Sequence, residues 1–264
     1  MDSGDGVVKA GGLAGQAAGL VRRLGVAVLD QFYPPVCLNC EAAIAAADGL
    51  CARCFSQLRP ITAPLCPRLG IPFEVPLGPD AVSAEAIADP PPFDRARSAV
   101  AYNEVASRLV GRLKYGDRPE LARFCARLMA AAGHELWPGN PVLVPVPLHR
   151  FRHFERRYNQ STELARALAR ITGLKVDPML ASRVKRTKQQ VGLSADQRQR
   201  NVAGAFVARP DALARLAGHG VVIVDDVITT GSTVKAVTRA LQKAGVRQID
   251  VVSFARVVVG QGLS

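Results

Sequence analysis

From residue 93 to the end of the chain, two patterns of apolar and polar positions take turns along the sequence. Short apolar runs predict strands, and stretches with apolar residues at every third or fourth position predict helices. The predicted strands are 96–102, 142–147, 221–224 and 249–254, and the predicted helices are 105–113, 119–132, 159–172 and 232–244. Strands that alternate with helices indicate an α/β domain with a parallel sheet covered on both faces. Because such sheets bind ligands beyond the carboxyl ends of their strands, we expect the site in the loops after Pro147 and Val224.

The chain before residue 93 lacks this alternation and divides into three parts. Residues 1–32 contain apolar positions spaced as in an amphipathic helix, residues 33–72 carry most of the cysteines, and residues 73–92 are typical of a linker, since Pro and Gly interrupt regular structure. No run of ~18 or more uncharged apolar residues occurs, and the first residues lack the order of a signal peptide. We therefore expect a cytoplasmic protein without a membrane span.

Four cysteines form two CxxC pairs with ten residues between them. Each pair can direct two thiolates at one ion, and four sulfur ligands leave no open position for chemistry, so the spacing predicts a structural zinc site. Disulfides are the alternative, although they are rare in a reducing compartment. The predicted ligands are Cys37, Cys40, Cys51 and Cys54.

The other two cysteines fit this pattern less well. Cys66 stands where a second CxxC knuckle could begin, but position 69 is leucine, so a second zinc site is not expected; whether Cys66 takes part in metal binding stays open. Cys125 lies among Leu121, Phe124 and Leu128 at helical spacing and is predicted to be a core residue.

The positive charge is concentrated in one stretch. The chain carries a net charge of +12, and residues 141–200 hold thirteen Lys or Arg against four Asp or Glu. This stretch is either a solvated basic surface or a surface that meets pyrophosphate, nucleic acid or both. Phe151, Phe154 and Tyr158 are interleaved with its arginines, as on surfaces that stack nucleic-acid bases.

The segment 221–234 combines a strand, a polar loop and the start of a helix. Thr229, Thr230, Ser232 and Thr233 offer hydroxyl donors at the predicted helix N-terminus, and Gly231 allows close approach of the backbone, which together favour a phosphate. Asp225 and Asp226 would repel that phosphate. Their carboxylates instead match the vicinal hydroxyls of a ribose, directly or through hydrated Mg²⁺.

The sequence VVIVDDVITTGSTV at 221–234 resembles the phosphoribosyl pyrophosphate (PRPP) signature of type I phosphoribosyltransferases. The runs 144–160 and 183–201, the triplet 113–115 and the N-terminal cysteines together resemble the ComF family of competence-associated proteins. This resemblance implies a zinc-ribbon-like module at 33–72 before a type I phosphoribosyltransferase fold at 93–264, with PRPP and Mg²⁺ as ligands. It also implies a link to DNA uptake or the use of external DNA. The incomplete second knuckle departs from the family pattern.

The resemblance also implies roles for individual residues. Asp225 and Asp226 would be the catalytic pair that holds the ribose. The candidates for pyrophosphate binding are Arg150, Arg152 and Lys114. The candidates for a flexible loop that closes over the leaving group, or for a surface that faces nucleic acid, are Lys185, Arg186, Thr187 and Gln190.

Two hypotheses of function remain open at this point. The first is a phosphoribosyltransferase with an unidentified acceptor. The second is an accessory protein that binds single-stranded DNA, works with the DNA-uptake machinery and does not turn over PRPP. The paired acids favour PRPP binding, whereas the basic stretch with its aromatic residues favours DNA.

Overall fold

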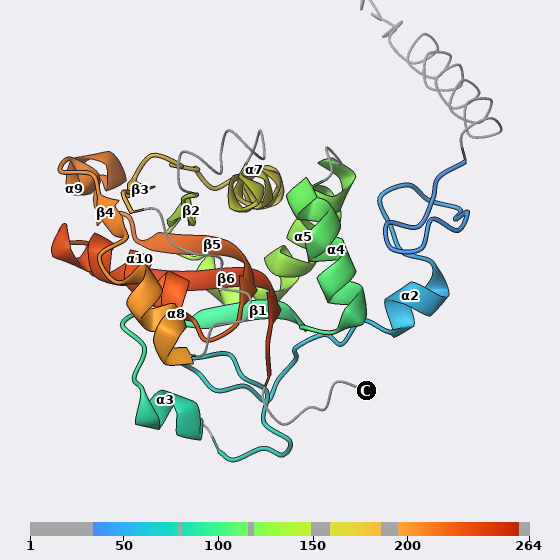
Figure 1. Cartoon of the computed structure of the whole chain (residues 1–264), viewed down its shortest axis with the longest axis horizontal. Coiled ribbons are helices and arrows are strands. Elements are labelled where there is room, and N and C mark those ends of the chain that lie inside the picture. Colours follow the sequence, from blue (N-terminus) through green and yellow to red (C-terminus); the bar gives the residue numbers. More distant parts are fainter. Residues whose placement is uncertain (1–33, 79–80, 116–118, 149–158, 186–194, 259–264) are drawn as a thin grey trace, which may run out of the picture. The chain divides into compact units, whose positions relative to one another are not determined.

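The computed structural model describes residues 34–78, 81–115, 119–148, 159–185 and 195–258 (Figure 1). The chain divides into two compact units, residues 1–51 and 52–264. The predicted helix in residues 1–32 lies outside the described residues. In the described ranges, no helix has both the length and the apolar character needed to cross a membrane.

The second unit is built on a four-stranded sheet in which all neighbouring strands are parallel. Its strand order is β1-β6-β5-β2. The bounds are Ala96–Ala101 for β1, Val142–Pro145 for β2, Val221–Ile228 for β5 and Ile249–Arg256 for β6. The predicted α/β class with a parallel sheet is therefore confirmed, and the carboxyl ends of the four strands lie at one edge.

Helices cover both faces of this sheet. The connection from β1 to β2 contains α4, α5 and the short 3-10 helix η1, whereas α7 follows β2 and α10 joins β5 to β6 (Figure 1). Helices α5 and α7 pack on one face and α10 packs on the other. The bounds are Glu104–Tyr115 for α4, Pro119–Ala132 for α5, His134–Leu136 for η1, Gln160–Thr172 for α7 and Ser232–Lys243 for α10.

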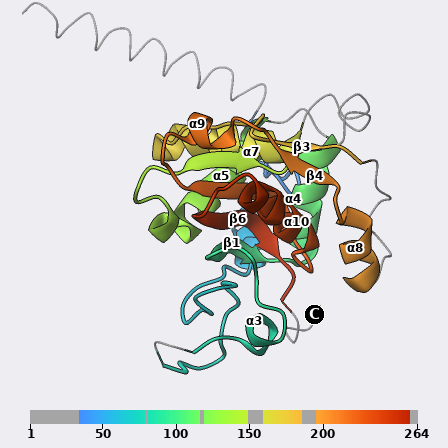
Figure 2. The ribbon, with the colours of Figure 1, turned by 90° about the vertical axis from the view of Figure 1, so that its left-hand side faces the viewer.

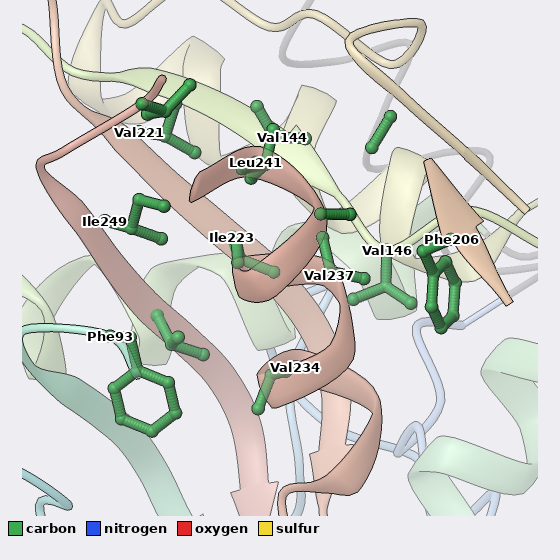
Figure 3. Packing of buried hydrophobic residues seen from close by; sticks show 14 of the residues in the cluster. Phe93, Val144, Val146, Phe206, Val221, Ile223, Val234, Val237, Leu241 and Ile249 are labelled. Atoms are coloured by element: carbon green, nitrogen blue, oxygen red, sulfur yellow. The ribbon is translucent and has the colours of Figure 1, made fainter. Parts of the chain in front are cut away.

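The apolar core follows the alternation of side chains along β5. Val221 and Ile223 point toward Val234, Val237 and Leu241 of α10 (Figure 3). Successive strand residues point to opposite faces, so the intervening residues of β5 face α5 and α7. The intervening residues are fully buried as well. Burial on both faces explains why the run at 221–224 is apolar at every position.

Between α7 and β5 lie four short elements that the sequence pattern did not predict. The strands β3 (Ala181–Arg183) and β4 (Phe206–Ala208) form an antiparallel pair, and α8 (Ala195–Val202) and α9 (Ala212–Leu216) complete the connection. Both β4 and α8 pack against α10 (Figure 2). The three-residue strands are too short to show a hydrophobic period, and α8 has too few apolar residues to show one.

Two further short helices lie before β1. They are α2 (Ala52–Ser56) and α3 (Ala84–Ala88). The expectation that Pro and Gly exclude helix throughout residues 73–92 is wrong at α3, because those residues flank the helix instead of interrupting it. Residues 59–68 run along the outer edge of β1, where Ile61 N donates to Ala99 O (3.0 Å) and Ala96 N donates to Arg68 O (2.8 Å).

Candidate functional site

The two adjacent acids lie inside strand β5. The prediction that this strand ends at Val224 is wrong, since β5 stays paired with β6 as far as Ile228, opposite Arg256. The neighbouring strand supplies backbone partners over this length, which outweighs the low strand propensity of aspartate. Asp225 and Asp226 are only 7% and 6% exposed. Strand pairing therefore fixes their backbone, in the carboxyl-terminal half of β5.

Asp225 is held by two donors. Its Oδ1 accepts hydrogen bonds from the backbone N of Asp226 (3.0 Å) and from Ser161 Oγ (3.3 Å). Burial, followed by the neighbouring charge of Asp226, raises the pKa of Asp225 well above its ordinary value. The carboxyl thus sits in a place where its charged form is costly.

Asp226 collects contacts from three elements. Its Oδ1 accepts from the backbone N of Val227 (2.8 Å). Its Oδ2 lies 3.0 Å from Lys114 Nζ, near the end of α4, and 3.4 Å from Gln160 Nε2, at the start of α7. The buried Gln160 Oε1 has no hydrogen-bond partner within the described part of the chain. This unsatisfied acceptor beside the acidic pair is available to a donor on a ligand.

The start of α7 is fixed by Asn159. Its side chain accepts from Ser161 N (3.0 Å) and donates to Val146 O (3.0 Å), which ties the helix N-cap to the end of β2. Gln160 and Ser161 follow as buried residues of the first turn. Neither residue was expected at the site from the sequence. The available signal was a run of three polar residues opening a helix directly after the basic loop.

The turn between β5 and α10 consists of Thr229, Thr230 and Gly231. Gly231 is the N-cap of α10 with φ 75°, a left-handed conformation that favours glycine. Thr230 Oγ1 and Ser232 Oγ are 2.7 Å apart, so the hydroxyls converge at the helix start. The first turn of a helix carries N–H groups without intrahelical acceptors and the positive end of the dipole. The predicted hydroxyl-rich turn is thus located at the N-terminus of a twelve-residue helix.

Of the basic and loop residues predicted for the site, the structure describes Lys114 and Lys185. Lys114 contacts the acidic pair and is 29% exposed in its side chain. Lys185 is exposed just beyond β3, where its Nζ donates to Ala203 O (3.3 Å). The remaining candidates lie outside the described residues; they are Arg150, Arg152, Arg186, Thr187 and Gln190.

The four cysteines of the CxxC pairs come together. The sulfur atoms of Cys37, Cys40, Cys51 and Cys54 all lie within 4.8 Å of one another, and all four are free thiols. Burial opposes ionisation of Cys37, but hydrogen bonds from the backbone of Cys40, Cys51 and Asn39 lower its pKa to about 6. Four sulfur donors, one of them easily ionised, fit a closed tetrahedral zinc site of structural type.

Two family models match the chain. Residues 28–86 match the double zinc ribbon domain, and residues 158–262 match the phosphoribosyl transferase domain. The second match contains α7, β5 and α10, which provide Gln160, the acidic pair and the hydroxyl-rich turn.

Relatives align over most of the chain. The DNA utilization protein YhgH of Salmonella typhi is 35% identical over 84% of this chain and 97% of its own length. Competence protein F of Haemophilus influenzae is 32% identical over 86% of this chain and 99% of its own length. Competence protein ComFC of Bacillus subtilis is 25% identical over 88% of this chain and 95% of its own length. Alignment of this extent, across both the cysteine module and the α/β domain, shows that the chain belongs to the ComF family of competence-associated proteins.

Proposed function

We propose that the α/β domain binds PRPP with Mg²⁺ and that the protein serves in competence-related use of DNA. The observation that carries the proposal is the position of the buried Asp225–Asp226 pair, separated by two residues from the turn that opens α10. An acidic pair and an anion-binding helix start, side by side on one chain segment, match a ligand that carries both hydroxyls and phosphate. The names of the relatives support the connection with DNA and competence.

The ribose would be held by the acidic pair. Burying a carboxylate costs on the order of several kcal/mol unless donors or cations compensate. Among the described residues, the cation paired with Asp226 is Lys114, so the described part of the chain compensates the two buried carboxylates only in part. Ribose hydroxyls, directly or through Mg²⁺, would supply the rest. Gln160 Oε1 would accept from a further hydroxyl beside Asp226.

The 5-phosphate would bind at the N-terminus of α10. Backbone N–H groups of the first turn and the hydroxyls of Thr230 and Ser232 are the donors for its oxygens. Gly231 holds the left-handed conformation that opens the helix, with φ 75°, and its missing side chain permits close approach of the backbone to the phosphate. The acids and the turn are joined by only Val227 and Ile228, so ribose and phosphate would be fixed relative to each other.

Catalysis would follow from positioning. In a phosphoribosyl transfer, the bond from C1 to pyrophosphate breaks and a bond to a nucleophilic acceptor forms, and the charge that develops on the ribose is stabilised by nearby carboxylates. Asp225 and Asp226 would hold the ribose during this step. Arg150 and Arg152, in the loop after β2, remain our candidates for the leaving pyrophosphate.

A second function is favoured by the charge distribution. Residues 141–200 carry thirteen Lys or Arg against four Asp or Glu. This excess suits the backbone of single-stranded DNA. In this alternative the protein would bind DNA in competence without turning over PRPP, and Lys185, Arg186, Thr187 and Gln190 would belong to the DNA surface.

Isothermal titration distinguishes these functions. PRPP with Mg²⁺ is titrated into the wild type and into an Asp225→Asn/Asp226→Asn variant, with and without a single-stranded oligonucleotide. We expect the variant to bind PRPP at least about tenfold more weakly and to bind the oligonucleotide normally. Asp211→Asn, at an exposed carboxylate paired with Arg209, is the matched control. If the wild type binds the oligonucleotide but does not bind PRPP, the proposed PRPP site is refuted and the second function is favoured.

A further inference from the structure

Residues 64–88 repeat the backbone of the cysteine module, although they contain a single cysteine. In the first copy, Val36 and Ala43 form an antiparallel bridge around a tight turn. In the second copy, Leu65 and Pro72 form the same bridge around the same kind of turn. The match extends to individual hydrogen bonds.

Three backbone hydrogen bonds define the first copy. Ile44 N donates to Pro35 O (2.9 Å), Cys37 N donates to Ala42 O (2.8 Å) and Glu41 N donates to Cys37 O (2.9 Å). Glu41 is left-handed, with φ 63°. Together these bonds form a closed knuckle with Cys37 at its first position.

The same three bonds recur in the second copy at a constant offset along the chain. Phe73 N donates to Pro64 O (2.8 Å), Cys66 N donates to Ile71 O (2.8 Å) and Gly70 N donates to Cys66 O (2.8 Å). Gly70 takes the place of the left-handed residue, with φ 64°. Cys66 therefore occupies the position of Cys37.

The second halves of the two copies also correspond. In the first, Cys51 N donates to the knuckle sulfur (3.3 Å), and α2 begins at the next residue with Cys54 as its third residue. In the second, Ser83 N donates to the Cys66 sulfur (3.4 Å), and α3 begins at the next residue with Ala86 as its third residue. The four ligand positions of the first copy thus correspond to Cys66, Leu69, Ser83 and Ala86.

These four residues do not fit a zinc ion. Leucine and alanine have no donor atom, which leaves one thiol and one hydroxyl where a structural site needs four ligands. All four are at most 6% exposed. Cys66, Leu69 and Ala86 belong to the apolar core together with Phe93 and Ala96. Hydrocarbon packing fills the place that the sulfur cluster takes in the first copy.

Protein groups dock the second knuckle on the sheet. Buried Arg97 donates to Pro67 O (3.1 Å), and buried Arg256 donates to Leu69 O (3.0 Å). A Cβ atom on Gly70 would overlap the carbonyl oxygen of Ala96, so the turn lies directly against β1.

We infer that residues 64–88 are a second zinc ribbon that has lost its metal and is held instead by the apolar core of the α/β domain. The match of residues 28–86 to a double zinc ribbon is therefore a match to two ribbon backbones but to one metal site. Zinc binds at Cys37, Cys40, Cys51 and Cys54, and the second ribbon keeps its shape without it.

A matched pair of variants tests this inference on the full chain. Cys37→Ser and Cys66→Ser change the equivalent position of the two ribbons. Elemental analysis of the purified proteins should find about one zinc per chain in the wild type and in Cys66→Ser, and almost none in Cys37→Ser. Two zinc ions in the wild type, or zinc lost from Cys66→Ser while Cys37→Ser keeps its metal, would overturn the inference.

A restoration experiment tests the correspondence of positions. Leu69→Cys, Ser83→Cys and Ala86→Cys together give the second ribbon four cysteines. We expect this variant, folded by circular dichroism, to bind about one additional zinc ion, and the same three substitutions combined with Cys66→Ser to bind it far more weakly. A folded triple variant that takes up no further zinc would show that the four positions do not correspond.

Discussion

At the scale of single residues, the site is dominated by the electrostatics of Asp225. Burial and the charge of Asp226 raise the pKa of this carboxyl, so the folded protein holds its proton to a higher pH than the unfolded chain does. Stability therefore falls as pH rises from about 4, the ordinary value of an aspartate, through the raised value in the folded state. Functional sites often retain such costly groups.

Asp225→Asn should remove this cost. We expect the variant to be more stable than the wild type by about 1 kcal/mol at neutral pH, and the difference to vanish below pH of about 4, where both folded and unfolded wild type are protonated. Thermal unfolding at a series of pH values measures this. Asp211→Asn serves as the control, because its exposed carboxyl has a lowered pKa and no such penalty to remove. A stability difference that does not depend on pH would contradict the explanation.

Lys114→Met should have the opposite effect. The substitution leaves Asp226 buried without its cation and should lower the free energy of unfolding by about 1–3 kcal/mol, less than for a fully buried pair because the lysine is 29% exposed. Chemical denaturation of Lys114→Met, Asp226→Asn and the double variant gives the coupling energy. Additive effects of the two substitutions would show that the pair contributes nothing.

At the scale of elements, the sequence predicted the long parts of the fold and missed the short ones. The helices α5, α7 and α10 have clear apolar periods, and the interior strands are apolar runs, so their positions were predictable. The pairing that extends β5 to Ile228 and the contacts of Gln160 and Ser161 with the acids depend on neighbours distant in sequence. Of the second ribbon, the sequence indicated only a possible first knuckle at Cys66, because the other three cysteines that mark the first ribbon are replaced by leucine, serine and alanine.

The N-cap of α7 should matter for binding as well as for stability. Asn159→Ala should cost about 1 kcal/mol of stability and weaken PRPP binding, because it releases the helix start that carries Gln160 and Ser161. Asn103→Ala is a matched control, since Asn103 accepts from Ala106 N (3.0 Å) at the far end of α4 from Lys114. Calorimetry should show a similar stability loss for both variants and weaker PRPP binding for Asn159→Ala alone. Equal PRPP binding by the two variants would show that the N-cap of α7 does not contribute to PRPP binding.

At the scale of the whole molecule, the cysteine cluster and the proposed PRPP site are formed by segments that lie far apart in the sequence. The first compact unit carries Cys37, Cys40 and Cys51, and the second unit begins at Ala52, shortly before Cys54, and contains the acidic pair and the turn at α10 much later in the chain. Loss of zinc should therefore leave the proposed PRPP site intact.

Cys51→Ser tests this independence. The variant should release zinc and loosen the first ribbon, whereas PRPP binding and the unfolding of the α/β domain should stay as in the wild type. Elemental analysis, hydrogen exchange and titration of PRPP measure the three quantities. Faster exchange in β5 or α10 would show that the zinc site supports the domain after all.

The metal-free ribbon has a consequence for cells that are short of zinc. Its packing against β1 comes from leucine, alanine and two arginines, which are part of the polypeptide and need no added ion. Newly made protein can therefore complete this half of the ribbon pair before any metal is delivered. Under zinc starvation we expect the protein to accumulate with a folded α/β domain and an unfolded first ribbon. Folding of the first ribbon would then depend on the zinc supply, and folding of the second would not.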